Sequence, residues 1–382
     1  LFRLSEDVDV ARLKDALAAL VARHEALRTQ VVRGSPDQQR FAENLRVPLV
    51  VLELEMDDLE NGRWRRPVNL GEPALFRVTL LKPRGGAQMI ALELHALVAD
   101  HETGAILQSD LQALYHGRGL AAFAHGGYRQ WLTRHVLSKK RTAAERHWLL
   151  KLPEGGWRLR VDSRWFASQE SGTYARARAT IGGEHQAQIE RQAIESRISP
   201  ATFVLAAFAC VLSRMAEKRS ICVWLLGHPR EVMGYQGVAG PLSRYIPLTF
   251  VVEPDRPFRS LLLKIKYEML DAHQHLGSAP DLRTTAVFCE TDLTPLAVAF
   301  RYVEDSAGTR DDQPSYSDSC EREFDLALDA RWSSLGLELA LTAAPALGNI
   351  PDEILAALVA TAKHFSEAPD QPLAQMERIL AW

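Results

Sequence analysis

Apolar side chains recur at the spacing of one helix face in several stretches of the chain. The clearest stretch is 8–28, VDVARLKDALAALVARHEALR, where Asp9 is the predicted N-cap. Its apolar face carries Val10, Leu13, Leu17, Leu20 and Val21. In a second helical stretch, Ser199 is the predicted N-cap and Pro200 suits the first helical position. Helices are predicted at 102–117, 128–152, 183–196, 199–216, 258–276 and 351–368.

Short β-like runs separate these helices in both halves of the chain. They are predicted at 29–32, 47–55, 74–81, 88–95, 172–181, 221–227, 246–252, 324–330 and 335–343. Glycines and a proline at 153–165 indicate a linker, and the polar run 304–319 indicates a surface loop. The pattern predicts two mixed α/β domains, 1–160 and 161–382.

Composition narrows the class of protein. The 45 basic and 48 acidic side chains are interspersed and leave a net charge of −3, so no patch for nucleic acid or anionic lipid is expected. No apolar run reaches the roughly 18 residues that span a bilayer. The cysteines lack the spacing of a zinc site or a disulfide framework. We therefore expect reduced thiols and a cytoplasmic protein, and the missing initiator methionine predicts a piece of a longer chain.

Candidate chemistry gathers in ELHALVADHETG, residues 93–104, between a predicted strand and a predicted helix. The segment holds His95, Asp100 and His101. A histidine with a near-neutral pKa that is oriented by an acid suits acyl transfer, because it can take a proton from an attacking amine or hydroxyl. Alone the pattern is a weak signal, since such residues in loops are more often caps or surface groups.

The order of several motifs along the chain resembles the condensation domains of nonribosomal peptide synthetases. These motifs are RHEALRT, HALVADH, LQALYHGRGL, YRQWL, ERHWLLKL, GHPREV and GPLSRYIPL. The resemblance covers nearly the whole chain. It implies two chloramphenicol-acetyltransferase-like subdomains that form a V-shaped pseudo-dimer, with the active site at the seam and carrier proteins arriving from opposite faces. The N-terminal subdomain then lacks the first strand and helix usual in the family.

The family's active-site pattern, HHxxxDG, is altered in this sequence. Laid on residues 95–101, it puts Ala96 where the family has the histidine that orients or deprotonates the acceptor amine, and His101 where it has the glycine. A methyl group neither accepts a proton nor forms a hydrogen bond. The resemblance gives His95 and Asp100 structural roles, and we expect Arg23 or Arg28 to pair with Asp100.

A second departure lies further along the chain. Where the family has an Asn-Thr pair on a loop that floors the tunnel, this sequence has Arg244 and Tyr245. These side chains either narrow the channel or face the cleft wall, and the sequence leaves both possibilities open.

The resemblance implies a domain that no longer forms amides and serves as a platform, as in the recruitment (X) domains of glycopeptide synthetases. Such domains dock haem monooxygenases that act on a peptide linked through phosphopantetheine to a peptidyl carrier protein. No cofactor or metal ion is implied. The alternative is an active, non-standard acyltransferase in which His101 assists. A stand-alone acetyltransferase and an epimerisation domain rank lower, because both rely on the histidine that is lost.

Overall fold

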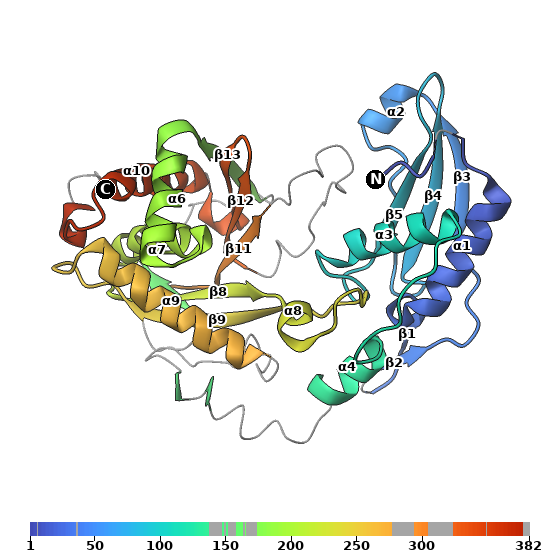
Figure 1. Cartoon of the computed structure of the whole chain (residues 1–382), viewed down its shortest axis with the longest axis horizontal. Helices are drawn as coiled ribbons and strands as arrows, with labels where there is room; N and C mark the ends of the chain where they lie inside the picture. The colour runs from blue at the N-terminus through green and yellow to red at the C-terminus, as the bar shows by residue number, and fades with distance from the viewer. Residues whose placement is uncertain are drawn as a thin grey trace. The chain divides into compact units, whose positions relative to one another are not determined.

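The computed structural model describes residues 1–5, 7–35, 37–136, 147–148, 150–151, 158–162, 165, 174–276, 294–304, 324–348 and 350–376. These residues form two compact units (Figure 1). Unit 1 contains the described residues of 1–138 together with His228–Ser243, and unit 2 contains the other described residues. Both units mix helices and strands, so the predicted α/β class is confirmed. The segment His228–Ser243 belongs to unit 1 although it follows residue 160. A boundary at residue 160 itself stays a prediction.

Unit 1 is built around one small sheet. Its longer elements are α1 (Val10–Arg23), β3 (Leu49–Leu54), β4 (Phe76–Pro83), β5 (Met89–Leu94) and α3 (Thr103–Tyr115). Its shorter ones are η1 (Glu25–Arg28), β1 (Thr29–Val32), β2 (Gln38–Phe41), α2 (Met56–Glu60), α4 (Tyr128–Trp131), the π-helix η2 (Leu132–Val136) and α8 (Pro229–Met233). The strand order is β3-β4-β5, with β3 parallel and β5 antiparallel to β4, while β1 and β2 form a separate antiparallel pair.

The core of unit 1 joins helices α1 and α3 to the sheet. Leu13 and Leu17 of α1, Leu80 of β4 and Leu107 of α3 belong to one cluster and are at most 1% exposed. The Tyr115 hydroxyl, at the end of α3, accepts a hydrogen bond of 3.0 Å from the backbone N–H of Asp9. Since β5 enters and α3 leaves the segment 95–102, this core holds both ends of the loop with the candidate motif.

Unit 2 has a larger sheet. Its strands are β6 (Leu159–Val161), β7 (Ala175–Ile181), β8 (Ser220–Gly227), β9 (Arg244–Val251), β10 (Thr294–Leu296), β11 (Val298–Glu304), β12 (Leu326–Ser333) and β13 (Gly336–Ala343). Its helices are α6 (Gly183–Ser196), α7 (Pro200–Ala216), α9 (Phe258–Gln274), η7 (Pro345–Leu347), α10 (Ile350–Glu367) and η8 (Leu373–Gln375). The six-stranded order is β7-β13-β12-β11-β8-β9, in which β11 is parallel to both neighbours and the remaining pairs are antiparallel; β6 and β10 pair separately.

Helix α7 lies at the centre of the core of unit 2. Nearly all of its side chains are buried, as is typical of a helix that is apolar on all sides. Phe258 of α9 packs against Phe203 of α7 and stacks on Phe365 of α10, with ring centroids 5.2 and 4.4 Å apart. Cys210 and Cys222 are free and buried, and burial raises the pKa of both thiols. Cys289 and Cys320 lie outside the described residues.

Most predicted elements match the structure, with one correction at the first helix. Helix α1 ends at Arg23 instead of continuing to residue 28, because His24 adopts an extended conformation and η1 follows it. The buried His24 ring hydrogen-bonds to Asp110 of α3 (2.9 Å), and this contact stabilises the end of the helix at Arg23. Residues 137–146 of the predicted helix 128–152, most of the linker 153–165, and 305–319 of the polar run lie outside the described residues.

In the described part of the chain, no single helix combines the length and hydropathy needed to cross a membrane. Helices α6 and α7 pass that test of length and composition only when taken together, and they meet at a bend of 106°.

The N-cap of α1 yields a stability prediction. A carboxylate oxygen of Asp9 accepts hydrogen bonds from the backbone N–H groups of Ala11 (2.8 Å) and Arg12 (3.1 Å). Replacing Asp9 by Ala leaves both donors unpaired and should lower the free energy of unfolding by about 1 kcal/mol. Urea denaturation followed by circular dichroism measures this. The control is Asp15→Ala, an exposed position of the same helix, which should change stability by no more than about 0.5 kcal/mol; equal losses would contradict the cap.

Candidate functional site

The motif loop begins at His95, directly after β5. The His95 backbone N–H donates to the carbonyl of Leu75 (2.9 Å), and its own carbonyl accepts from Val98 N–H (2.9 Å). Its ring Nδ1 accepts a hydrogen bond from the backbone N–H of Leu97 (3.1 Å). His95 therefore closes the turn that redirects the chain from the strand toward α3.

Ala96 is the next residue and lies in that turn. Ala96 is exposed, so packing in the core does not explain why this position carries an alanine. The side chain supplies no donor, no acceptor and no titratable group.

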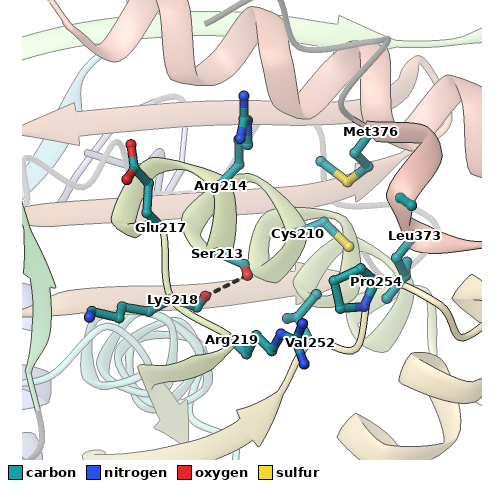
Figure 2. Close-up of a pocket in the computed structure, with 11 residues that line it drawn as sticks. Cys210, Ser213, Arg214, Glu217, Lys218, Arg219, Val252, Pro254, Leu373 and Met376 are labelled. Atoms are coloured by element: carbon teal, nitrogen blue, oxygen red, sulfur yellow. Dashed lines mark hydrogen bonds between the residues drawn. The ribbon is translucent and has the colours of Figure 1, made fainter.

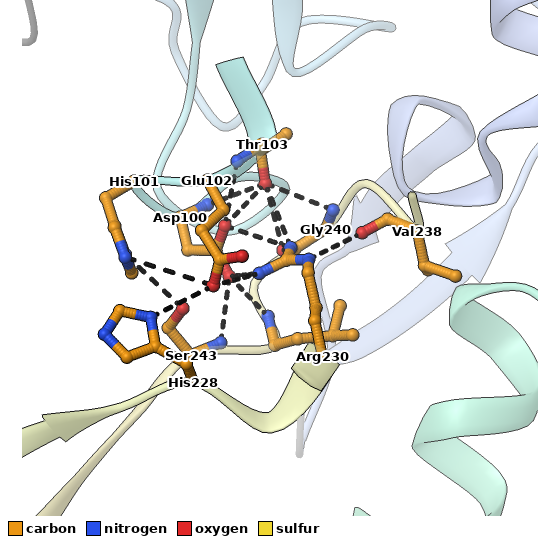
Figure 3. Close-up of polar contacts among 10 residues, drawn as sticks. Asp100, His101, Glu102, Thr103, His228, Arg230, Val238, Gly240 and Ser243 are labelled. Atoms are coloured by element: carbon orange, nitrogen blue, oxygen red, sulfur yellow. Dashed lines mark hydrogen bonds and ion pairs between the residues drawn. The ribbon is translucent and has the colours of Figure 1, made fainter. Parts of the chain in front are cut away.

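Asp100 forms a buried ion pair with Arg230 of α8 (Figure 3). The guanidinium donates to both carboxylate oxygens, over 2.8 and 3.0 Å, and the two side chains are 9% and 2% exposed. Arg230 also donates to the carbonyls of Val238 (2.9 Å) and Gly240 (2.7 Å). The arrangement is a bidentate pair in which the guanidinium has further acceptors, as a buried arginine requires.

Backbone groups complete the bonding of Asp100. The N–H groups of Leu242 and Ser243 donate to one carboxylate oxygen over 2.9 and 2.8 Å, and the N–H of Thr103 donates to the other over 3.1 Å. Gly240 adopts φ +141°, and a Cβ there would lie 2.8 Å from the Tyr128 ring, so the close approach of this backbone requires glycine.

The bonding of Asp100 determines its charge state. Burial by itself raises the pKa of this carboxyl, but the charge and hydrogen bonds of Arg230 and the Ser243 N–H outweigh burial and lower the pKa to about 2. The carboxylate stays ionised at neutral pH with its oxygens occupied. Asp100 is therefore suited to holding the loop and unsuited to taking a proton.

His101 lies in a second polar group beside this pair (Figure 3). Its Nε2 is 4.0 Å from Glu102 Oε1, its Nδ1 is 3.4 Å from the Ser243 hydroxyl, and its ring centroid is 5.1 Å from that of His228. His228 Nδ1 is 3.3 Å from the same Glu102 oxygen, to which Arg230 also donates over 3.2 Å. Burial raises the pKa of Glu102, but the contacts with His228 and Arg230 bring it below its ordinary value.

The predicted partners of Asp100 are wrong. Arg23 instead pairs with Asp110 (2.9 Å), and Arg28 donates to the carbonyl of Ala42 (3.1 Å). Arg23 links the end of α1 to α3, and Arg28 links η1 to the segment after β2, so both arginines support unit 1. The true partner, Arg230, stands in GHPREV, a motif that already contributed to the family resemblance, and this was the signal that could have identified it.

Arg244 and Tyr245 are the first residues of β9 in unit 2, paired with Gly227 and Leu226 of β8. The Tyr245 ring packs edge-on against Phe324, with centroids 4.5 Å apart. Their role as a tunnel floor stays a prediction.

A pocket of about 340 Å³ lies in unit 2 and contains none of the predicted site residues (Figure 2). Arg214, Lys218 and Arg219 supply positive charge to its lining, and the Ser213 hydroxyl donates to the Lys218 carbonyl (2.6 Å). We assign no function to it.

Comparison with known proteins shows which family the chain matches. A family model described as a condensation domain matches residues 1–378. The chain is 27% identical over 331 residues to the PKS-NRPS hybrid synthetase psoA of Aspergillus fumigatus, and 27% identical over 287 residues to tyrocidine synthase 3 of Brevibacillus parabrevis. The matches cover 79% and 71% of this chain but 8% and 4% of those proteins, so the chain corresponds to a small part of each.

Among solved structures, the complex of the X-domain and OxyB from teicoplanin biosynthesis contains a chain of the same fold. The TM-score is 0.79 at 18% identity, and the match covers 98% of this chain and 88% of that one. At this identity the similarity establishes the fold alone.

The Asp100–Arg230 pair yields a second stability prediction. Arg230→Met removes the cation but leaves a buried, ionised Asp100, so the free energy of unfolding of unit 1 should fall by roughly 3–5 kcal/mol. Chemical denaturation measures the change. The control is Arg63→Met, since Arg63 pairs with Asp57 and Asp58 on the surface and its loss should cost at most about 1 kcal/mol. Similar costs for both variants would contradict a structural role for the buried pair.

Proposed function

The chain belongs to the condensation-domain family, and from this membership we propose a condensation-like domain of a nonribosomal peptide synthetase that no longer forms amide bonds. It acts as a platform for enzymes that modify a peptide held on a carrier protein. The observation that carries the proposal is a contrast between two residues of the motif loop. Asp100 accepts hydrogen bonds from Arg230 at both carboxylate oxygens, while the position expected for the functional histidine is the exposed Ala96.

Amide formation from a thioester and an amine is accelerated by a group that orients the amine or removes its proton. Ala96 has none. Asp100 does not replace it, because its pKa of about 2 makes it a very weak base at neutral pH and its oxygens already accept hydrogen bonds. His95 is engaged in its own turn through Nδ1.

The retained contacts support a binding role. A surface that docks another protein needs a rigid fold but no proton transfer, and the Asp100–Arg230 pair supplies rigidity to the loop. The teicoplanin X-domain shares the fold and forms a complex with OxyB. By analogy, we propose that this chain binds a haem monooxygenase that acts on a peptide attached to a peptidyl carrier protein.

One observation favours an active domain as the second candidate. His101 is partly exposed and lies beside Glu102, so an imidazole with a carboxylate neighbour is present six positions beyond His95. Under this alternative the domain joins a carrier-bound thioester to an amine or hydroxyl acceptor, and His101 assists the proton transfer.

A condensation assay separates the two candidates. With a donor and an acceptor on separate carrier proteins, we expect no amide product above the enzyme-free background, detected by mass spectrometry of the released peptide. Ala96→His combined with His101→Gly restores the family pattern and serves as the test for gain of activity. Loss of a general base typically costs about 10²–10⁴-fold in rate, so even a weak gain is measurable.

The control for that assay is His101→Ala. If the unmodified chain forms the amide and His101→Ala removes the activity while the fold is retained, the platform proposal fails and the active candidate stands. An unchanged absence of product in both proteins agrees with the platform.

Recruitment is tested by binding. Mixed with a haem monooxygenase encoded beside the same synthetase, the chain should form a complex of micromolar affinity, about −8 kcal/mol, visible in size-exclusion chromatography and calorimetry. A haem monooxygenase from an unrelated pathway is the control. Equal binding of both enzymes, or binding of neither, would remove support for recruitment.

A further inference from the structure

His101, Glu102 and His228 each offer one ligand atom, and these atoms all lie within 4.8 Å of one another. All three residues belong to unit 1, and their side chains are 17%, 27% and 31% exposed. We propose that they bind a divalent transition-metal ion, zinc(II) in the first instance. Two imidazoles and a carboxylate are ligands that zinc accepts. This inference is independent of the platform proposal.

One of the three ligand–ligand distances already has the value for a tetrahedral ion. Zinc-ligand bonds of about 2.0–2.2 Å place neighbouring ligand atoms about 3.3 Å apart. His228 Nδ1 and Glu102 Oε1 are separated by 3.3 Å, and His101 Nε2 is 4.0 Å from the same oxygen. The His101 atom lies within 4.8 Å of the other two, so binding one ion requires the His101 ring to move toward them.

Ring orientation separates this cluster from another one in unit 2. A histidine lone pair lies in the plane of its ring, so two rings at a wide angle can aim at one ion. The rings of His101 and His228 are inclined at 71°. In the other cluster, His147 and His275 are stacked 3.6 Å apart at 9°, and Lys151 already binds its carboxylate, Asp271. Parallel planes do not let both lone pairs converge, so that cluster is the natural comparison.

The surroundings supply the outer contacts that a metal ligand needs. A histidine that binds zinc usually donates its other ring N–H to an oxygen. The Ser243 hydroxyl, 3.4 Å from His101 Nδ1, can accept that proton, and Nε2 is then left with its lone pair toward Glu102. Arg230 donates to Glu102 and fixes the carboxylate, while its own charge is balanced by Asp100. These three protein ligands leave a fourth position for water or another ligand.

The test uses the 382-residue chain with metal alone. Cobalt(II) should give the visible absorption bands of a tetrahedral ion, and the chain should compete with a chromogenic chelator for zinc(II) at pH 7.5 with a stoichiometry of one ion per chain. His101→Ala and His228→Ala should each weaken zinc binding by more than about 10-fold, and Ser243→Ala by about 10-fold. Two variants serve as controls and should bind zinc as tightly as the unmodified chain does. They are His275→Ala in the other cluster and His116→Ala, an exposed position at the end of α3.

The proposal is overturned if the unmodified chain binds zinc no more tightly than a variant lacking both His101 and His228, or if His275→Ala abolishes binding. Circular dichroism verifies that each variant folds. If His101→Ala does not fold, the more exposed His228→Gln gives the same test. The metal measurements involve no amide formation and no partner protein, so failure here leaves the platform proposal untouched.

Discussion

The buried pair of Asp100 and Arg230 is the interaction on which the architecture of the candidate site depends. The two residues are 130 positions apart, and their contact joins the loop after β5 to the segment between β8 and β9. An isolated charge in this setting would be costly, so the pair persists only with its full set of partners. Leu242, Ser243, Val238 and Gly240 supply them from the same segment. This pairing, together with the apolar contacts of Tyr235, Val238 and Leu242 in the cluster of Tyr128 and Trp131, places His228–Ser243 in unit 1 although the segment follows residue 160.

The local parts of this architecture follow from the sequence, and the long-range pairing does not. Asp9 and Ser199 cap the helices predicted for them, because an N-cap depends on groups within three residues. The predicted strand pair at 324–330 and 335–343 forms as β12 and β13. The partner of Asp100 was assigned wrongly to the arginines of RHEALRT, because hydrophobic periodicity does not tell which distant cation reaches a buried acid; only the GHPREV motif pointed to Arg230.

In the motif loop, the residues that stabilise the fold differ from the position expected to carry the chemistry. His95 closes a turn, and Asp100 ties that turn to α8; both contacts stabilise the folded chain whether or not a reaction takes place. The position predicted for the family's functional histidine is of a different kind, since Ala96 is exposed. Losing an imidazole there removes no core packing. A domain can therefore lose amide formation at this position and keep its fold, which is the combination that a binding platform requires.

The predicted replacement of the motif glycine by His101 differs from the exchange at Ala96. A histidine at position 101 is not a neutral exchange, because its ring meets Ser243, Glu102 and His228 in one polar group. The hydrogen bonds of Asp100 come from Arg230, the Thr103 hydroxyl and backbone N–H groups. The His101 ring adds a second imidazole to a group that already contains an acid, a hydroxyl and the His228 ring. The predicted loss at Ala96 and the predicted gain at His101 are thus separate changes, and the second is what the proposed ligand site in this loop would need.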